Sequence, residues 1–327
     1  MSTAKARLKA GIRRAARGLP RKPRPAILMY HRICRATFDP WGLAVEQDRF
    51  AAQVEWLAGN RTVLPLTNFA RLHQERTLPR DAIALTFDDG YASVLNAIPS
   101  LQRHGLPATV FLPAELIERG RDFWWDELVQ IVLDYPGDTL QLNDVRLAVP
   151  PAHERDRLWQ PDTPPSTPRQ KLFQSVWARL HAMRPVAVDA AMAQLREQAM
   201  PAKNAPSAAD GPLTLEQVRW VRSSTVTFGS HGLSHPSLPA LGQDEKLREI
   251  GDSHARCEAI TGTAPAAFAY PYGELDEPSI HLVEQAGYAC ACATGDAFVS
   301  SRNGIFALPR LRAGNWEPGR LRDMLGG

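Results

Sequence analysis

Cysteine is scarce in this sequence, and several other signatures are missing. The four cysteines among 327 residues, Cys34, Cys257, Cys290 and Cys292, lack the spacing of a zinc ribbon, and nothing calls for an oxidising compartment. No apolar run is long enough to cross a bilayer. We also find no internal repeat and no glycine-rich phosphate loop. The length and the globular composition suit one large barrel with an insertion, or two domains.

Acidic residues are absent from residues 1–24, which carry nine lysines and arginines. Subtracting these nine charges from the net charge of +3 leaves −6 for residues 25–327. Basic residues also interrupt the apolar core that a secretory signal peptide needs. The leader could form a helix with one apolar face, which predicts contact with an anionic membrane surface, or it could be a solvated tail. Nucleic acid is not an expected partner, because the remainder is acidic and has no nucleic-acid-binding motif.

Two adjacent carboxylates end an apolar run. Residues 82–85 predict a buried parallel strand, which leads into Asp88, Asp89 and Gly90. The C-terminal ends of such strands carry the chemistry in α/β proteins, and neighbouring side chains on a strand point opposite ways. The two aspartates can therefore take different roles. A plain turn would explain the same residues, since Asp and Gly are favoured there.

Two histidines follow a second predicted strand, at residues 225–229. His231 and His235 are four residues apart and would lie on one face if the segment turned helically. A carboxylate and two neutral imidazoles with open positions suit a catalytic divalent metal site. A third apolar run ends at Pro271-Tyr272-Gly273, an irregular turn that can direct a backbone N–H at a developing oxyanion.

These three motifs, in this order, resemble those of the polysaccharide deacetylase family, carbohydrate esterase family 4 (the NodB homology domain). The resemblance covers roughly residues 25–120 and 213–315. It implies a distorted (β/α) barrel, one divalent metal ion, with zinc expected, and hydrolysis of N-acetyl or O-acetyl groups on sugars. It also implies that Asp89, His231 and His235 bind the metal.

The same resemblance assigns the remaining chemistry, with two departures. Asp88 would be the general base, and the Tyr272 backbone N–H would help to hold the oxyanion. Ala269 stands where the family usually has an arginine, and Arg310 stands near the place of the usual C-terminal histidine. The leaving amine nevertheless needs a proton, which a histidine can supply near neutral pH and an arginine cannot.

His31 is our candidate for this general acid. It lies near the C-terminal end of the strand predicted at 26–33, and a closed barrel brings its first and last strands side by side. Some family members resemble this arrangement, with the last motif moved to the N-terminus. The alternative is that His31 only caps the barrel through a bond to a backbone carbonyl.

Strands and helices alternate through most of the chain, which favours a βα barrel over a sandwich. Beyond the motif strands, we expect helices at about 46–58 and 91–104, a helix beginning with Thr67 as N-cap, and a long helix at 241–260. The final strand is expected at about 305–311.

Residues 121–212 break this alternation. A helix from 123 to about 133, a hairpin around Asn143-Asp144 and helices near 168–183 and 186–198 predict an α-rich insertion beside the barrel mouth. Deacetylases of this family from exopolysaccharide gene clusters carry similar insertions, which is an analogy.

Tryptophans of the insertion could contact a sugar. Trp124, Trp125 and Trp159 could stack on sugar rings, or they could pack in the core of the insertion. Trp125, Asp126 and Arg310 are our candidates for substrate binding.

We therefore predict an α/β fold, a distorted (β/α) barrel of the polysaccharide deacetylase type with an α-rich insertion. Residues 1–24 would form a basic leader, and residues 25–327 the deacetylase domain, interrupted by the insertion 121–212. We expect a cytoplasmic enzyme, peripheral to the inner membrane if the leader binds it, that removes acetyl groups from a glycan or glycan precursor. Two other classes stay open: an amidohydrolase acting on a small cyclic amide, and an inactive carbohydrate-binding homologue.

Overall fold

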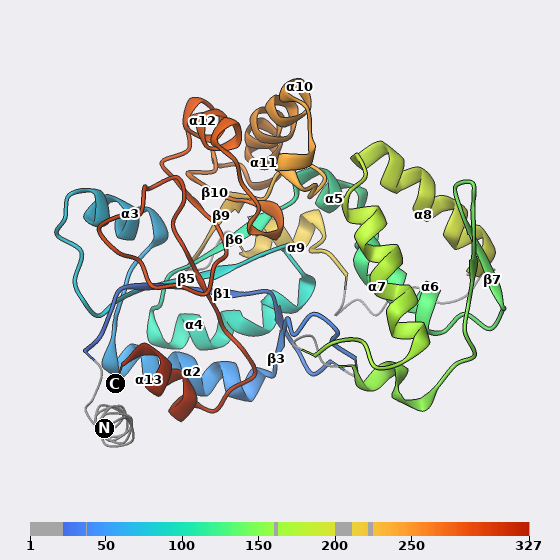
Figure 1. Cartoon of the computed structure of the whole chain (residues 1–327). Coiled ribbons are helices and arrows are strands. Elements are labelled where there is room, and N and C mark those ends of the chain that lie inside the picture. The colour runs from blue at the N-terminus through green and yellow to red at the C-terminus, as the bar shows by residue number, and fades with distance from the viewer. Residues whose placement is uncertain (1–21, 37, 160–162, 200–210, 222–224, 327) are drawn as a thin grey trace, which may run out of the picture.

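The architecture is a curled parallel sheet surrounded by helices (Figure 1). The computed structural model describes residues 22–326 except 37, 160–162, 200–210 and 222–224. The predicted leader, residues 1–24, therefore lies almost entirely outside the described residues. None of the helices in the described part of the chain has the length and hydropathy needed to cross a bilayer.

The central sheet has a run of seven strands in which each pair of neighbours is parallel. In spatial order these are β11 (Cys290–Cys292), β10 (Ala267–Ala269), β9 (Val226–Ser230), β6 (Ala108–Leu112), β5 (Ala82–Phe87), β1 (Ala26–Tyr30) and β12 (Leu311–Arg312). A further strand, β4 (Thr62–Val63), pairs with the first residues of β5. The strands β1, β5 and β6 are buried along their whole length, which explains their unbroken apolar sequences.

The two ends of the sheet approach each other through the segment that precedes β12. Strand β12 pairs with β1, so the first and last strands do lie side by side. On the other side, the Ala291 N–H donates to the Ile305 carbonyl (2.8 Å) and the Leu308 N–H donates to the Ala291 carbonyl (2.9 Å). This bridging segment completes the distorted (β/α) barrel that we predicted.

Helices cover both faces of the sheet (Figure 1). On one side lie α2 (Gln47–Asn60), α4 (Ile98–His104) and α13 (Pro318–Leu325); on the other lie α10 (Gln243–Leu247), α11 (Ser253–Thr261) and α12 (Glu277–Gln285). The remaining helices of the barrel are α3 (Leu66–Gln74), α5 (Ala114–Arg119) and α9 (Leu215–Val221). The predicted sequence of strands and helices is thus confirmed.

Several predicted boundaries are wrong, each for a local reason. The helix α3 starts at Leu66 with Pro65 as its N-cap, so Thr67 is already inside it. The long helix expected at 241–260 is divided by a π-helical turn, η4 (Arg248–Asp252). The last strand begins only at Leu311, because the residues before it bond to β11 through an isolated bridge at Leu308, and pairing with β1 starts at Leu311.

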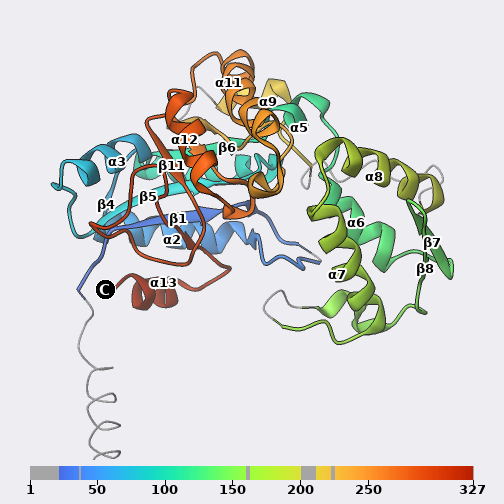
Figure 2. The same cartoon turned by 45° about the horizontal axis from the view of Figure 1, so that its top comes forward.

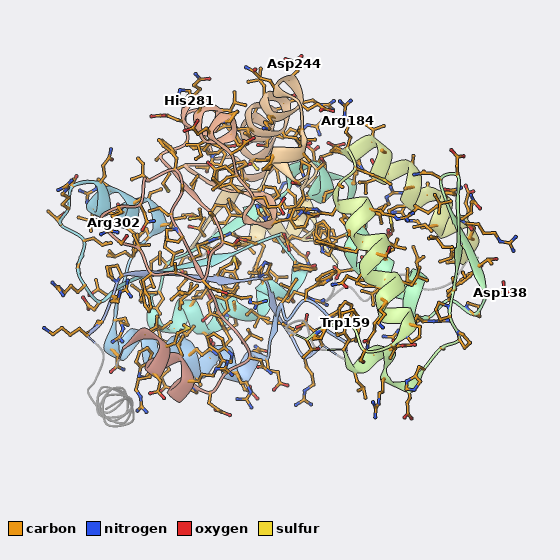
Figure 3. The ribbon with its side chains drawn as sticks, viewed as in Figure 1. Asp138, Trp159, Arg184, Asp244, His281 and Arg302 are labelled. Carbon is orange, nitrogen blue, oxygen red and sulfur yellow. The ribbon has the colours of Figure 1, made fainter. Side chains whose placement is uncertain are left out.

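Residues 124–159 and 163–199 form a lobe beside the sheet with a hydrophobic cluster of its own (Figures 1 and 2). Its elements are α6 (Trp124–Leu133), the antiparallel hairpin of β7 (Thr139–Leu142) and β8 (Val145–Ala148), α7 (Pro168–His181) and α8 (Pro185–Ala199). Trp159, labelled in Figure 3, is 8% exposed and packs edge-on against Phe173. Most of its ring therefore belongs to the lobe's core, as the core alternative predicted. The outer limits 121–212 stay a prediction.

Candidate active site

The strand end after β5 turns sharply at its two aspartates. The Asp88 N–H donates to the Tyr30 carbonyl of β1 (2.9 Å), which extends the pairing of the two strands by one bond. Asp89 and Gly90 then both have positive φ values, +68° and +67°. Glycine adopts this left-handed backbone without strain, and a Cβ atom at Gly90 would also lie 2.5 Å from Leu112 Cδ2. The curl lets the two carboxylates make different contacts.

His231 is fixed at the end of β9 by two hydrogen bonds to neighbouring strands. Its N–H donates to the Leu112 carbonyl (2.8 Å), and its Nδ1 lies 2.7 Å from the Ala269 carbonyl. A carbonyl only accepts, so Nδ1 carries the proton and the Nε2 lone pair is available. That Nε2 lies 3.4 Å from Asp89 Oδ1.

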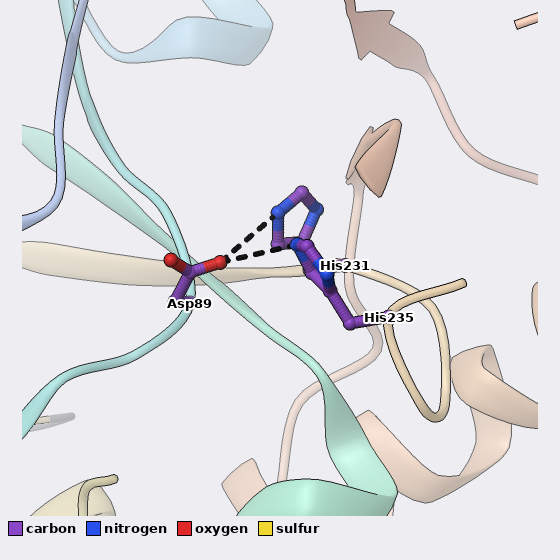
Figure 4. Close-up of side chains that lie close together, drawn as sticks. All are labelled: Asp89, His231 and His235. Carbon is purple, nitrogen blue, oxygen red and sulfur yellow. Dashed lines mark ion pairs between the residues drawn. The ribbon is translucent and has the colours of Figure 1, made fainter. Parts of the chain in front are cut away.

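His235 reaches the same carboxylate oxygen, with its Nε2 3.3 Å from Asp89 Oδ1 (Figure 4). The segment between the histidines is a loop, not the helical turn that we expected, and both Gly232 (φ +78°) and His235 (φ +60°) are left-handed. Glu249 holds this loop by accepting hydrogen bonds from the Leu233 and Ser234 N–H groups and from the Ser234 hydroxyl. The buried loop therefore brings the second imidazole back over the strand end.

These three residues fit a divalent metal. One ligand atom from each of Asp89, His231 and His235 lies within 4.8 Å of the others, and all three side chains are buried. Burial raises the pKa of Asp89, but the adjacent His231 and His235 imidazoles hold it well below its usual value. Two imidazole nitrogens and one carboxylate oxygen are a common donor set for zinc, with room left for water and substrate.

Asp88 is held by an arginine from the far end of the chain. The Arg310 guanidinium donates to both Asp88 carboxylate oxygens (2.6 and 2.7 Å) and to the Ala293 carbonyl (2.9 Å). Burial raises the pKa of Asp88, but the charge of Arg310, followed by that of His231, lowers it below its usual value. Arg310 is completely buried. Our suggestion that it binds substrate is therefore corrected: its donors are used to orient and ionise Asp88.

His31 lies on the same cavity as these groups. A hollow of about 410 Å³ is lined by His31, Asp88, Asp89, His231 and His235, among others. Among the described residues, no hydrogen bond ties the His31 ring to a backbone carbonyl. Burial lowers the pKa of His31, while the charges of Asp89 and Asp88 act in the opposite direction.

Tyr272 forms another wall of this cavity. It sits in a tight turn with a φ of +58°, and its ring packs edge-on against His235 with centroids 4.5 Å apart. The turn needs glycine at 273, because a Cβ there would come within 1.9 Å of Thr294 Oγ1. Burial raises the pKa of the Tyr272 hydroxyl well above its usual value, so the phenol stays neutral.

Comparison with known proteins agrees with this geometry. The family model described as polysaccharide deacetylase matches residues 75–134 and 184–291, just over half of the chain. The chain belongs to the polysaccharide deacetylase family. The two matched segments hold both aspartates, both histidines and the Tyr272 turn of this deacetylase.

Individual relatives are similar to this deacetylase over most of its length. It is 20% identical to YxkH of Bacillus subtilis (strain 168), named a putative polysaccharide deacetylase, over 88% of this chain and 70% of that protein. Its fold is similar to that of the Streptococcus pyogenes deacetylase PplD, solved in complex with acetate (TM-score 0.60, 18% identity, 94% and 100% of the two chains). It is also similar to IcaB from Ammonifex degensii (TM-score 0.58, 16% identity, 94% and 99%). At such low identity, these structures support the barrel fold.

The sequence-predicted substrate residues of this deacetylase lie in different places. Trp125 lines the cavity with its ring 4.6 Å from His235, and its Nε1 donates to the Tyr91 hydroxyl (2.9 Å). That hydroxyl in turn donates to Asp126 (2.7 Å). Burial raises the pKa of Asp126 to about 7. Asp126 is not among the residues that line the cavity, and the described contacts make it an anchor for Tyr91 and, through it, Trp125.

Three cavity residues of the deacetylase were missed from the sequence. Trp41 packs against Trp177 (5.2 Å between ring centroids), Trp177 stacks on His181 (4.8 Å), and His181 meets Tyr272 (4.5 Å). All of them line the cavity. Trp177 and His181 are four apart on α7, a spacing that places them on one helix face and would have been a usable signal.

Proposed function

We propose that this enzyme hydrolyses acetyl groups, N-acetyl in preference to O-acetyl, from an amino-sugar-containing glycan or glycan precursor. The role we favour is in exopolysaccharide or cell-envelope polysaccharide metabolism. The observation that carries the proposal is the buried Asp89–His231–His235 cluster beside an ionised Asp88, in one cavity with His31. Such a site supplies the groups that amide hydrolysis needs.

The residues of the cluster would hold one divalent cation, which we expect to be zinc. When bound, the cation supplies Lewis-acid polarisation of the acetyl carbonyl. Asp88 takes a proton from the attacking water as the oxygen–carbon bond forms. Arg310 keeps the Asp88 carboxylate ionised and aimed, and the Tyr272 backbone N–H stabilises the oxyanion.

His31 completes the reaction by giving its proton to the leaving amine nitrogen as the carbon–nitrogen bond breaks. An imidazole can release a proton at physiological pH, whereas the guanidinium of Arg310 cannot. Support comes from the shared cavity: β1 and β12 are neighbours, so a histidine just after β1 occupies the end of the sheet where a C-terminal acid would otherwise be expected.

Acetate release from an acetylated chitooligosaccharide by the purified, zinc-loaded enzyme tests this function. We expect release with the natural chain and strong loss with Asp88→Asn. Hydrolysis of a small cyclic amide without acetate release would instead favour another amidohydrolase. Oligosaccharide binding with no turnover on any ester or amide would favour an inactive carbohydrate-binding homologue.

We also propose that the enzyme acts in the cytoplasm, with the basic residues 1–24 holding it against the anionic inner membrane. Removing residues 2–24 should weaken sedimentation with anionic liposomes and leave turnover of soluble substrates intact. Equal liposome binding by the full and shortened chains would contradict the membrane role.

A further inference from the structure

The barrel has two ends, and the active-site cavity occupies one of them. Neighbouring strands of the central sheet are parallel, so the stretches of chain that lead into the strands gather at the opposite end. We call that end the base of the barrel. It consists of residues 22–25, 61, 75–81, 105–107, 225, 262–266, 286–289 and 298–304. In Figures 1 and 2 the helix α3 lies at the base, and the inserted lobe lies at the other side of the sheet.

Contacts between distant stretches hold the base together. The Val299 N–H donates to the Pro25 carbonyl (3.0 Å), and the Arg24 guanidinium lies over the Phe298 ring (4.5 Å). His73 Nε2, in the last turn of α3, lies 2.8 Å from the Asn303 carbonyl. Arg302, labelled in Figure 3 at the end of the molecule away from the lobe, is therefore close to the point where the chain enters β1.

The base is cationic, although residues 25–327 together carry a charge of −6. Its stretches contain two acids, Glu75 and Asp81, and six basic residues: Lys22, Arg24, Arg61, Arg76, Arg80 and Arg302. All six except the half-buried Arg61 are exposed, and none of these five forms an ion pair with a described residue. Glu75 is paired with Arg71 of α3 (2.8 Å), which offsets its charge.

The mouth of the barrel has the opposite charge. The stretches that leave the strands toward the next helices contain two basic residues, Arg32 and Arg35, and eight acids: Asp39, Glu46, Asp88, Asp89, Glu274, Asp276, Asp296 and Glu317. Arg310, Arg312 and a bound divalent cation would offset four of the six excess negative charges. The barrel therefore carries positive charge at its base and negative charge at its mouth.

We propose that the base of the barrel is a docking face for an anionic membrane surface. Such a surface attracts the exposed cations of the base and repels the acidic mouth, so one orientation is favoured. The leader is continuous with this face: Lys22 and Arg24 belong to the base, and seven further lysines and arginines precede them in the sequence. The inference rests on the proposed membrane location and makes it narrower, because it adds a face of the fold to the leader.

Docking through the base turns the active-site cavity toward water. The strand β5 runs from the base to Asp88, and its six residues span roughly 20 Å at about 3.3 Å per residue. The metal cluster would thus stand about 20 Å from the lipid headgroups. A sugar joined directly to a membrane lipid would not reach it. The substrate is then a soluble glycan precursor, or a part of a glycan that lies well away from its lipid.

The test is sedimentation of the full chain with liposomes of phosphatidylglycerol in phosphatidylcholine. Arg80→Glu combined with Arg302→Glu should lower the partition coefficient by about tenfold or more, because each cation that faces such a surface strengthens binding. The matched control is Arg146→Glu combined with Arg155→Glu. These two arginines are exposed on β8 and η2 (Glu154–Leu158) of the lobe and form no ion pair with a described residue. The control changes the net charge equally, but charges beyond a screening length of about 10 Å at 0.1 M salt should alter binding less than about twofold.

A second measurement checks the orientation. For a water-soluble activated aryl acetate, kcat/KM of the liposome-bound natural enzyme should stay within about twofold of the value for the free enzyme, because docking leaves the cavity open and the fold unchanged. A bound enzyme that loses this turnover would show that the mouth faces the lipid and would overturn the orientation.

Two sedimentation results would overturn the docking face. Equal binding by the natural protein and the Arg80→Glu, Arg302→Glu variant would leave the leader as the membrane contact, and equal losses in both double variants would show that net charge alone matters. If the natural protein does not sediment with anionic liposomes, the docking face and the membrane location fail together. The deacetylase function is judged separately, because sedimentation needs no turnover and acetate release needs no membrane.

Discussion

The barrel end and the inserted lobe meet at one cavity and contribute different kinds of groups to it. The barrel supplies two carboxylates and three histidines at or just after strand ends, where hydrogen bonds to neighbouring strands fix residues such as Asp88 and His231. The lobe supplies Trp125, Trp177 and His181, which meet the barrel groups through ring contacts.

This difference suggests that the barrel aligns the reacting groups and that the lobe contributes to glycan binding. Hydrogen bonds to adjacent strands restrain the strand ends, so the catalytic side chains there can be held in the positions that the reaction needs. A helix such as α7 instead packs in the hydrophobic cluster of the lobe, and its contacts with the barrel groups of the cavity are ring contacts. We therefore expect changes in the barrel to affect turnover of every substrate, and changes in the lobe to affect glycan binding.

The metal cluster should give the largest effect. The double variant His231→Ala, His235→Ala removes two of three ligands, and we expect loss of bound metal and about 10³-fold lower kcat on all acetylated substrates, since such an ion contributes several kcal/mol. Elemental analysis and initial rates provide the measurements. Stoichiometric metal in the double variant would rule out this site.

Asp88→Asn should come next. An amide keeps the shape but cannot accept the proton of the attacking water, so kcat should fall by about 10²-fold or more while metal content stays at the natural level. Turnover near that of the natural enzyme in a metal-replete Asp88→Asn protein would remove Asp88 as the base.

Arg310→Ala tests how much the ion pair between Arg310 and Asp88 contributes to the stability of the fold. Removing the guanidinium leaves Asp88 buried without its counter-charge, which typically costs about 3–5 kcal/mol of stability. Chemical denaturation, with exposed Arg322→Ala as the control, measures this loss. An unfolding free energy equal to that of the control would show that the Arg310–Asp88 pair adds nothing to the fold.

The sequence predicted the grouping of Asp89, His231 and His235 better than it predicted the contact of Arg310 with Asp88. Asp89, His231 and His235 follow strands that are parallel, so their gathering at one end of the sheet follows from the pattern of strands alone. The backbone between His231 and His235 could not be predicted in this way. Positive φ values at Gly232 and His235 make it a loop, whereas the spacing of the histidines suggested a helical turn.

Arg310 was misassigned because its partner is 222 positions away. The only indication in the sequence was that two positions differ from the residues usual in the family: Ala269 stands in place of an arginine, and Arg310 stands near the place of a histidine. Which strand end Arg310 reaches depends on how the segment before β12 closes the sheet, and closure is a property of the whole barrel. The contacts of Trp41 with α7 escaped prediction for the same reason, since they depend on how the lobe docks.

His31→Ala should separate substrates by their leaving groups. N-acetyl turnover should fall by about 10- to 100-fold, because an amine must be protonated as it leaves, and aryl acetates should lose much less. Folding and metal content should be unchanged. Equal losses on both substrate types would indicate that His31 positions the substrate or the wall of the cavity, not the proton.

Trp177→Ala should have the smallest effect on activity, and unlike the barrel variants it should change KM and not kcat. Its ring lines the cavity between Trp41 and Tyr272, so its loss should raise KM for an acetylated oligosaccharide about fivefold, the scale of one aromatic contact, with little change in kcat. The neighbouring Val176 is the matched control: it is 1% exposed and packs inside the lobe. Val176→Ala should lower the unfolding free energy by about 1–3 kcal/mol and leave KM unchanged. A Trp177→Ala enzyme that loses kcat on aryl acetates and oligosaccharides alike would place α7 within the catalytic machinery and break the division between barrel and lobe.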